Sequence, residues 1–277
     1  MTAFSSDAAA AGPIVLVGAG NMGGAMLTGW LKSGIPGASV IVVDPSPSEK
    51  MAALIAEAGA SHVTRLPEGA VAGVLFLALK PQVMEAVLPS VRHAVGPETV
   101  VVSVAAGKTL SFFETHLGEA AMVRAMPNTP AMIGRGVTGA FGNARVSEAT
   151  KALVHSLLQV SGPVEWVASE ADIDSVTAVS GSGPAYVFYL VECMAEAGRK
   201  LGLPADLAMR LARETVAGAG ELLHRSSDEA SRLRQNVTSP GGTTAAALSV
   251  LMADNGMQPL FDEAIAAARK RAEELAG

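Results

Sequence analysis

The sequence predicts an α/β protein in which a parallel sheet, covered by helices on both faces, is followed by an all-helical region. Short continuous apolar strands alternate with helical segments through residues 13–168, as is typical of parallel strands buried on both faces. A glycine-rich turn follows the first of these strands directly. Strand signals then stop, and residues 169–277 show only helical patterns. We therefore expect two domains with a boundary near residue 168.

The expected elements of the first domain alternate regularly. Residues 1–12 precede them and are expected to be a frayed leader. Strands are predicted at 14–17, 39–44, 74–79, 99–104 and 122–126, with a weaker pair at 137–141 and 164–167. Helices are predicted at 21–32, 48–58, 82–93, 110–117 and 147–158.

The second domain is expected to consist of helices at 170–179, 184–201, 205–224, 227–236, 243–254 and 259–275. The stretch from residue 186 to 194 is apolar almost all round its helix, and such a helix must be buried on all sides. A helical region of about a hundred residues cannot easily supply that cover by itself. We therefore predict that two subunits pack their helical regions together. The closing run 269–274 mixes both charge signs and is expected to be a solvated helix face.

Composition narrows the class of protein. Of 277 residues, 49% are hydrophobic and 17% charged, with a formal net charge of −6. Such a chain buries a core, and without a basic run it gives no indication of a nucleic-acid partner. The longest apolar stretch, residues 71–79, is too short for a membrane-spanning helix. We expect no membrane association.

Cysteine and histidine usage adds two expectations. The single cysteine, Cys193, excludes a disulfide framework and fits a reducing cytoplasm. Because Cys193 lies in an apolar run, it is expected to be a buried packing thiol. The five histidines are scattered, and none has metal-ligand spacing, so no metal site is predicted.

The glycine-rich turn has the spacing of a dinucleotide-binding motif. Gly18, Gly20 and Gly23 match G-x-G-x-x-G between a strand and a helix. Gly18 permits the tight turn, Gly20 leaves room for a pyrophosphate, and Gly23 lets the helix pack closely on the strand. Asn21 and Met22 open that helix, whose free N–H groups attract phosphate. We therefore predict a Rossmann domain that binds NADPH or NADH.

The residues after the second strand leave the choice of cofactor open. Asp44 ends that strand, and a carboxylate there usually bonds the ribose hydroxyls and favours NADH. Ser46, Ser48 and Lys50 follow closely and could hold a 2′-phosphate. Alternatively, Ser48 simply caps the next helix.

Two other strand ends are expected at the same ligand edge. Lys80 and Pro81 end the third long strand, and the carboxyl ends of parallel strands face the ligand crevice in this fold. Pro81 should end the strand and start the helix, whereas Lys80 either approaches the cofactor or lies on the rim. The small residue Ala105 ends the following strand, where it allows the backbone to approach the nicotinamide or makes a plain tight turn.

Three further segments, 124–131, 180–186 and 237–244, place proline and small hydroxyl residues beside a helix, and the last two also contain glycine. The third separates two predicted helices. Its backbone N–H groups at Gly241, Gly242 and Thr243 would form an anion-binding nest at a helix N-terminus. A substrate with a carboxylate suits such a nest, whereas a mere connecting loop would not explain a double glycine flanked by proline and threonines.

From about residue 13 to the last helix, the sequence resembles the pyrroline-5-carboxylate reductases. The resemblance implies a Rossmann domain followed by a helical domain that makes a homodimer, with dimers often assembled into decamers. It also implies that NAD(P)H transfers a hydride to the C=N carbon of 1-pyrroline-5-carboxylate while the ring nitrogen gains a proton, giving L-proline in the final step of proline biosynthesis. The segments that carry the resemblance are 18–23, 79–82, 124–130, 181–185 and, most specifically, 237–244.

The resemblance also implies roles for individual residues. Thr244 would be the catalytic residue, with its hydroxyl near the ring nitrogen, and Asn128 would contact the cofactor. Some members have a glutamate facing the nitrogen near the start of the preceding helix, but residues 226–229 here read Ser-Ser-Asp-Glu, so no such acid is assigned. Hydride transfer to an electrophilic protonated imine needs positioning more than a strong acid. The residues implied around the substrate are Thr238, Ser239, Gly241, Gly242 and Thr243.

Two other classes of enzyme and one non-enzymatic role are alternatives to a pyrroline-5-carboxylate reductase. A β-hydroxyacid dehydrogenase would need a lysine in the helix after the turn at 180–184, but the next lysine is Lys200. A general imine reductase would not need the carboxylate nest. A dinucleotide sensor without catalytic activity would have no reason to keep the segment 240–244.

Overall fold

The computed structural model describes residues 12–276, which form two compact units. The first unit runs to Gly181 and also contains the chain from Ala268 onward; the second is Ser182–Ala267. The predicted leader, residues 1–12, lies outside the described residues except for Gly12. The first unit extends beyond residue 168 because helix α7 (Asp172–Val176) contacts β6 and β7 of the sheet.

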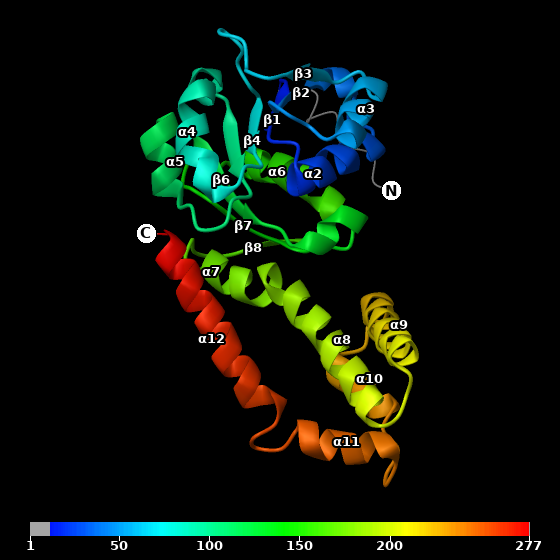
Figure 1. Cartoon of the computed structure of the whole chain (residues 1–277). Helices are drawn as coiled ribbons and strands as arrows, with labels where there is room; N and C mark the ends of the chain where they lie inside the picture. Colours follow the sequence, from blue (N-terminus) through cyan, green and yellow to red (C-terminus); the bar gives the residue numbers. More distant parts are fainter. Residues whose placement is uncertain (1–11, 277) are drawn as a thin grey trace. The chain divides into compact units, whose positions relative to one another are not determined.

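The strands of the first unit form one sheet (Figure 1). Among residues 12–276 it has eight strands in the order β3-β2-β1-β4-β5-β6-β7-β8. Neighbours are parallel except β6 and β7, which are antiparallel. The parallel sheet is therefore confirmed, with a short edge strand, β3, that the sequence did not predict. The bounds are β1 Ile14–Val17, β2 Val40–Val43, β3 Ser61–Val63, β4 Val74–Leu77, β5 Val100–Ser103, β6 Ala121–Met126, β7 Thr138–Gly142 and β8 Val164–Trp166.

Helices cover both faces of this sheet because successive strand residues point to opposite sides. Ile14 and Leu16 of β1 pack in one core cluster, and Val15 and Val17 pack in the other. The first face is covered by α2 (Asn21–Lys32), α3 (Glu49–Glu57) and α6 (Glu148–Leu158), and the second by α4 (Pro81–Val91) and α5 (Leu110–Leu117) (Figure 1). Trp30 anchors α2, since its indole N–H donates to the Leu157 carbonyl over 2.8 Å and its ring meets Phe76 edge-on.

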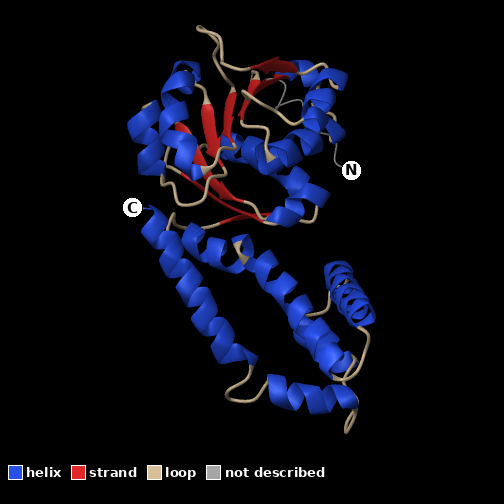
Figure 2. Ribbon diagram, viewed as in Figure 1, coloured by secondary structure: helices blue, strands red, loops and turns tan. Residues whose placement is uncertain are grey.

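The described residues of the second unit contain helices but no strand (Figure 2). The helices α8 and α9 pack against each other. The last residues of helix α12 belong to the first unit. Their charged side chains form exposed ion pairs such as Arg269–Glu273, so the predicted solvated helix face is confirmed. The bounds are α8 Gly183–Lys200, α9 Ala205–Arg225, α10 Ala230–Asn236, α11 Thr243–Leu251 and α12 Met257–Ala276.

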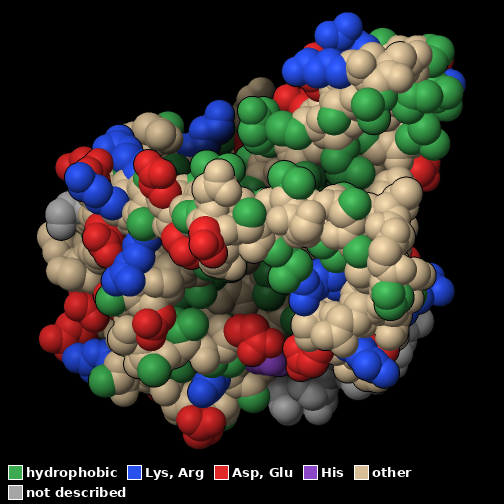
Figure 3. Space-filling model, turned by 90° about the horizontal axis from the view of Figure 1, so that it is seen from below, with side chains coloured by type: hydrophobic (Ala, Val, Ile, Leu, Met, Phe, Trp, Pro, Cys, Tyr) green, Lys and Arg blue, Asp and Glu red, His purple; other side chains and the backbone are tan. Residues whose placement is uncertain are grey.

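Large apolar side chains of α8 are exposed in the single chain. Phe188 is 62% exposed and Tyr189 is 66% exposed, and Figure 3 shows hydrophobic side chains gathered on the molecular surface. Cys193, which was expected to be buried, is also exposed on this helix. A side-chain hydrogen bond between Cys193 and Tyr189 raises the pKa of the Tyr189 hydroxyl. The expectation for Cys193 was wrong for the single chain because the predicted all-round burial of α8 needs a second surface to cover it.

Candidate functional site

The glycine-rich turn has the geometry that the motif predicts. Gly18 adopts a left-handed φ of +91°, and its N–H donates to the Val43 carbonyl over 2.9 Å. A Cβ on Gly23 would lie 2.0 Å from the Gly18 carbonyl oxygen, whereas a Cβ on Gly20 would meet no atom within 4 Å. Gly18 and Gly23 are therefore required by the fold of the turn, while the space beside Gly20 is open to a ligand.

Helix α2 begins at this turn without a side-chain cap. Gly20 occupies the N-cap position, and no side chain accepts from the first N–H groups of the helix. Asn21, the first helical residue, is exposed, and Met22 turns its side chain toward the core. The start of α2 thus offers backbone donors and the positive end of the helix dipole to an anion.

The Asp44 carboxylate, predicted to bond the ribose hydroxyls, accepts hydrogen bonds from two backbone N–H groups. One carboxylate oxygen accepts from the Ala19 N–H over 2.7 Å, and the other accepts from the Ser46 N–H over 2.8 Å. The carboxylate therefore holds the glycine-rich turn and the β2 loop together. Ser48 caps α3 by accepting from the Met51 N–H over 3.3 Å, so the alternative of a helix cap is confirmed for it.

A groove of about 1080 Å³ adjoins the glycine-rich turn and brings several predicted residues together. Its lining includes Gly20 and Asn21 of the turn, together with Asp44, Ser46, Ser48 and Lys50. The groove therefore combines backbone donors, two hydroxyls, one ammonium and one carboxylate. These groups can serve either a ribose or its 2′-phosphate.

The ends of β4 and β5 carry the other cofactor candidates. Lys80 is exposed and occupies the N-cap position of α4, with Pro81 as the first helical residue, as expected. Ala105 is buried after β5, and its N–H donates to the Ser103 hydroxyl over 3.3 Å. Two residues on, a Cβ at Gly107 would lie 2.8 Å from Leu275 of α12. The absence of a side chain at Gly107 thus leaves room for the last turn of α12. The sequence did not predict this contact between the loop after β5 and α12.

The substrate candidates lie in the second unit around the start of α11. Gly242 is the N-cap of α11, no side chain caps that helix, and Gly241 has a left-handed φ of +70°. Thr243 and Thr244 form its first turn, with Thr244 half-buried. The predicted double glycine at an uncapped helix N-terminus is therefore present, but the Gly242 N–H is already bonded to the Ser239 carbonyl, which leaves those of Gly241 and Thr243 for an anion.

Two residues beside this nest bond to their own loop. The Thr238 hydroxyl donates to the Arg234 carbonyl over 2.7 Å, which closes the end of α10. The Ser239 side chain is exposed, and its carbonyl accepts from the Gly242 N–H over 3.0 Å. Thr238 therefore has a structural partner that the sequence did not indicate.

Two side chains of the segment 124–131 form contacts within the chain. The Asn128 amide accepts from the Val137 N–H over 3.0 Å and donates to the Ser180 carbonyl over 3.2 Å. The Arg124 side chain is 3% exposed and pairs with Glu170 and Asp174. Both side chains thus bind the chain itself, and a cofactor contact by Asn128 stays a prediction with a competing structural role.

The described part of the chain contains neither a candidate membrane-spanning helix nor a candidate metal site. No helix between residues 12 and 276 is long and apolar enough to cross a membrane. Within the same residues, no group of three or more His, Cys, Asp or Glu side chains is placed to hold a metal ion.

The open glycine-rich turn, the parallel sheet and the helical unit define the class of a Rossmann-type dinucleotide-dependent oxidoreductase with a helical second domain. Comparison with known families supports this class. Residues 13–107 match the family model described as NADP oxidoreductase coenzyme F420-dependent, and residues 170–275 match the one described as pyrroline-5-carboxylate reductase dimerisation.

Individual proteins agree over nearly the whole chain. The pyrroline-5-carboxylate reductase of Pseudomonas aeruginosa is 42% identical over 265 residues, which cover 95% of this chain and 96% of that protein. The chain belongs to the pyrroline-5-carboxylate reductase family. The solved reductase of Coxiella burnetii has a TM-score of 0.89 at 35% identity, with 96% and 99% of the two chains covered. The Plasmodium falciparum enzyme, solved with NADP bound, has a TM-score of 0.78 at 26% identity, with 96% and 98% covered.

Proposed function

We propose that this chain reduces 1-pyrroline-5-carboxylate to L-proline at the expense of NADPH or NADH, the last step of proline biosynthesis. The observation that carries the proposal is the 42% identity to a reductase of this name across 95% of the chain. The open turn at Gly20 and the free start of α11 support it independently, since one suits a dinucleotide phosphate and the other a small carboxylate.

The first unit is proposed to bind the dinucleotide. When bound, the reduced nicotinamide supplies the hydride, and the protein supplies position. The N–H groups of Asn21 and Met22 at the start of α2 would face the pyrophosphate across the open Gly20. Gly18 and Gly23 would keep the turn close to the sheet. The remaining candidates for contacts to the cofactor are Asp44, Ser46, Lys80, Pro81, Ala105 and Asn128.

The second unit is proposed to bind the substrate. Ser239, Gly241, Gly242 and Thr243 would surround the carboxylate, because the uncapped start of α11 presents donors and a positive dipole end. Thr244 would place its hydroxyl at the ring nitrogen as that nitrogen gains its proton. The hydride ends on the imine carbon and the electron pair of the C=N bond ends on nitrogen, so the ring is reduced by two electrons and the dinucleotide is oxidised by two.

The assembly is proposed to be a homodimer formed by the helical units, which can assemble further into a decamer, in the cytoplasm. The exposed apolar side chains Phe188 and Tyr189 of α8 support the dimer, as does the match of residues 170–275 to a dimerisation family model. A second subunit would cover the helix that one chain leaves exposed.

The test is turnover by purified protein, followed through the loss of reduced nicotinamide with NADH and with NADPH. We expect oxidation that depends on 1-pyrroline-5-carboxylate, and a much lower kcat/KM for 1-pyrroline, the same cyclic imine without the carboxylate. Equal kcat/KM for both imines would support a general imine reductase. No turnover by folded protein that binds dinucleotide would overturn the proposal.

A further inference from the structure

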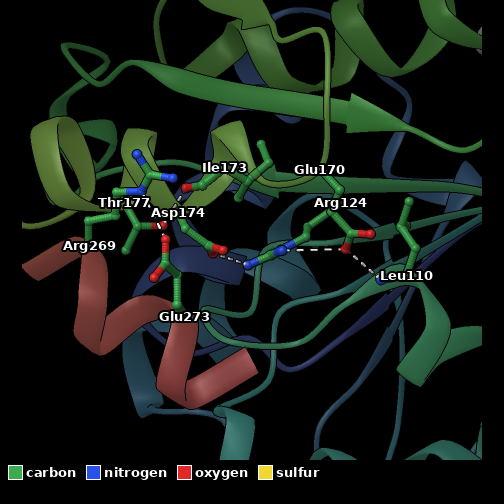
Figure 4. Close-up of polar contacts among 8 residues, drawn as sticks. All are labelled: Leu110, Arg124, Glu170, Ile173, Asp174, Thr177, Arg269 and Glu273. Carbon is green, nitrogen blue, oxygen red and sulfur yellow. Dashed lines mark hydrogen bonds and ion pairs between the residues drawn. The ribbon is translucent and has the colours of Figure 1, made fainter. Parts of the chain in front are cut away.

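A largely buried ion cluster, centred on Arg124, lies on β6. The Arg124 guanidinium donates to Asp174 over 2.9 Å and to Glu170 over 3.3 Å (Figure 4). The side chains of Arg124 and Asp174 are only 3% and 10% exposed. Glu170 also accepts from the Leu110 N–H over 2.8 Å, which ties the cluster to the start of α5.

Two further side chains that follow Arg124 at alternate positions contact the same segment. The Met126 methyl carbon lies 2.7 Å from the position of a Cβ on Gly181, and the Asn128 amide donates to the Ser180 carbonyl. Alternate residues of an extended chain point to one side. Arg124, Met126 and Asn128 therefore hold residues 170–181 along their length, through two ion pairs, a packing contact and a hydrogen bond.

The held segment is the first connection between the two units. It consists of α7 and the π-helical turn Thr177–Gly181, and it leads directly into Ser182 and the start of α8. A π-helical turn carries one residue more than an α-helical turn and is frequent at functional sites. In this protein, Met126 at the end of β6 and Asn128 just after it contact residues 180–181 of the π-helical turn.

We propose that Arg124 is a positioning residue for the reductase reaction, acting through Asp174 and Glu170 on the segment that enters the helical unit. The inference rests on the proposed function, because hydride transfer needs the groups that bind its reactants to be held in place. A misplacement of about 1 Å can cost on the order of a hundredfold in rate.

The chemistry of the cluster favours positioning over stabilisation. A buried ion pair is often matched or exceeded in stability by apolar residues of similar volume, so stability alone does not require an arginine here. Its planar fork, however, fixes two carboxylates in one geometry. Asp174 lies on α7 and Glu170 just before it, so this geometry sets both the height and the rotation of α7 over β6.

The test compares Asp174→Asn and Arg124→Lys with Leu88→Ala in the full-length protein. Asp174→Asn keeps the side-chain size and removes one charge, and Arg124→Lys keeps the charge and removes the fork. Leu88 is fully buried on α4, outside the cluster, so Leu88→Ala reports the effect of lost stability alone. Each variant is measured for Tm, dinucleotide Kd, kcat/KM for 1-pyrroline-5-carboxylate, and hydrogen exchange of the amides in residues 172–185.

We expect both cluster variants to lose about ten- to a hundredfold in kcat/KM and to exchange faster in residues 172–185, with an unchanged dinucleotide Kd. Leu88→Ala should lower Tm with no change in kcat/KM or in the exchange of that segment. If the cluster variants lose no more kcat/KM than Leu88→Ala, or if dinucleotide affinity falls in parallel, the inference is wrong. Wild-type protein without turnover would instead overturn the proposed function, and the exchange data would still test the hold on the segment.

Discussion

Alanine at two glycines of the same turn should separate ligand binding from folding. A Cβ at Gly20 would meet no atom within 4 Å, and Gly20 has φ −70° and ψ −157°, an extended conformation open to alanine. A Cβ at Gly23 would lie 2.0 Å from the Gly18 carbonyl oxygen and 3.0 Å from the Ala78 methyl group. The two substitutions add the same methyl group, so they are matched controls for one another.

The expected magnitudes follow from these distances. Gly23→Ala must move α2 off the turn, and overpacking of this kind costs about 1–3 kcal/mol, or about 2–4 °C in Tm for each kcal/mol in a domain of this size. Gly20→Ala should leave the free energy of unfolding within about 0.5 kcal/mol. Its methyl group occupies the phosphate approach, and losing one hydrogen bond to a charged group, worth about 1.5–3 kcal/mol, raises the dinucleotide Kd about ten- to a hundredfold.

The assay is thermal unfolding without ligand, together with titration of NADPH and NADH. Gly20→Ala should show weak binding at an unchanged Tm, and Gly23→Ala a lower Tm. The reasoning is refuted if Gly20→Ala binds dinucleotide as tightly as the wild-type protein, because the open space beside Gly20 would then not be the phosphate site.

Three further variants test other parts of the account. Asp44→Asn removes a negative charge beside Ser46, so the ratio of kcat/KM for NADPH to that for NADH should rise by more than about tenfold; an unchanged ratio means that Asp44 does not face the ribose. Thr244→Ala should lower kcat/KM about three- to tenfold through one lost hydrogen bond, with Thr244→Ser near wild type, and equal losses in both would remove the hydroxyl from the mechanism. Phe188→Asp places a charge on the exposed apolar face of α8 and should dissociate the dimer in light scattering, whereas an unchanged molar mass would locate the interface elsewhere.

The elements with strong local signals were predicted closely from the sequence. Helices α2 and α5 begin and end at the predicted residues, because a glycine turn precedes α2, the Thr109 cap precedes α5, and apolar residues recur at helical spacing in both. The edge strand β3 was missed because its residues, Ser61–Val63, are partly or wholly exposed and form no apolar run. The antiparallel pairing of β7 with β6 is a property of the sheet that no local pattern encodes.

The local backbone geometry of the candidate site was predictable where a motif acts through its own backbone, as in the turn at Gly18–Gly23 and the double glycine before α11. It was not predictable where the partner is distant in sequence. Arg124 pairs with residues 46 and 50 positions away, so only the folded chain shows that it is a buried ion-pair partner. Likewise, the contact of Gly107 with Leu275 joins the sheet to the last helix.

The measurement that tests the central claim most directly is the fate of deuterium from the cofactor. Purified protein is incubated with 1-pyrroline-5-carboxylate and nicotinamide dinucleotide carrying deuterium at the transferred position, and the product is analysed by NMR and chiral chromatography. The account predicts L-proline with one deuterium on the ring carbon that adjoins nitrogen and carries no carboxylate. Folded protein that binds the dinucleotide but yields no labelled proline would contradict it.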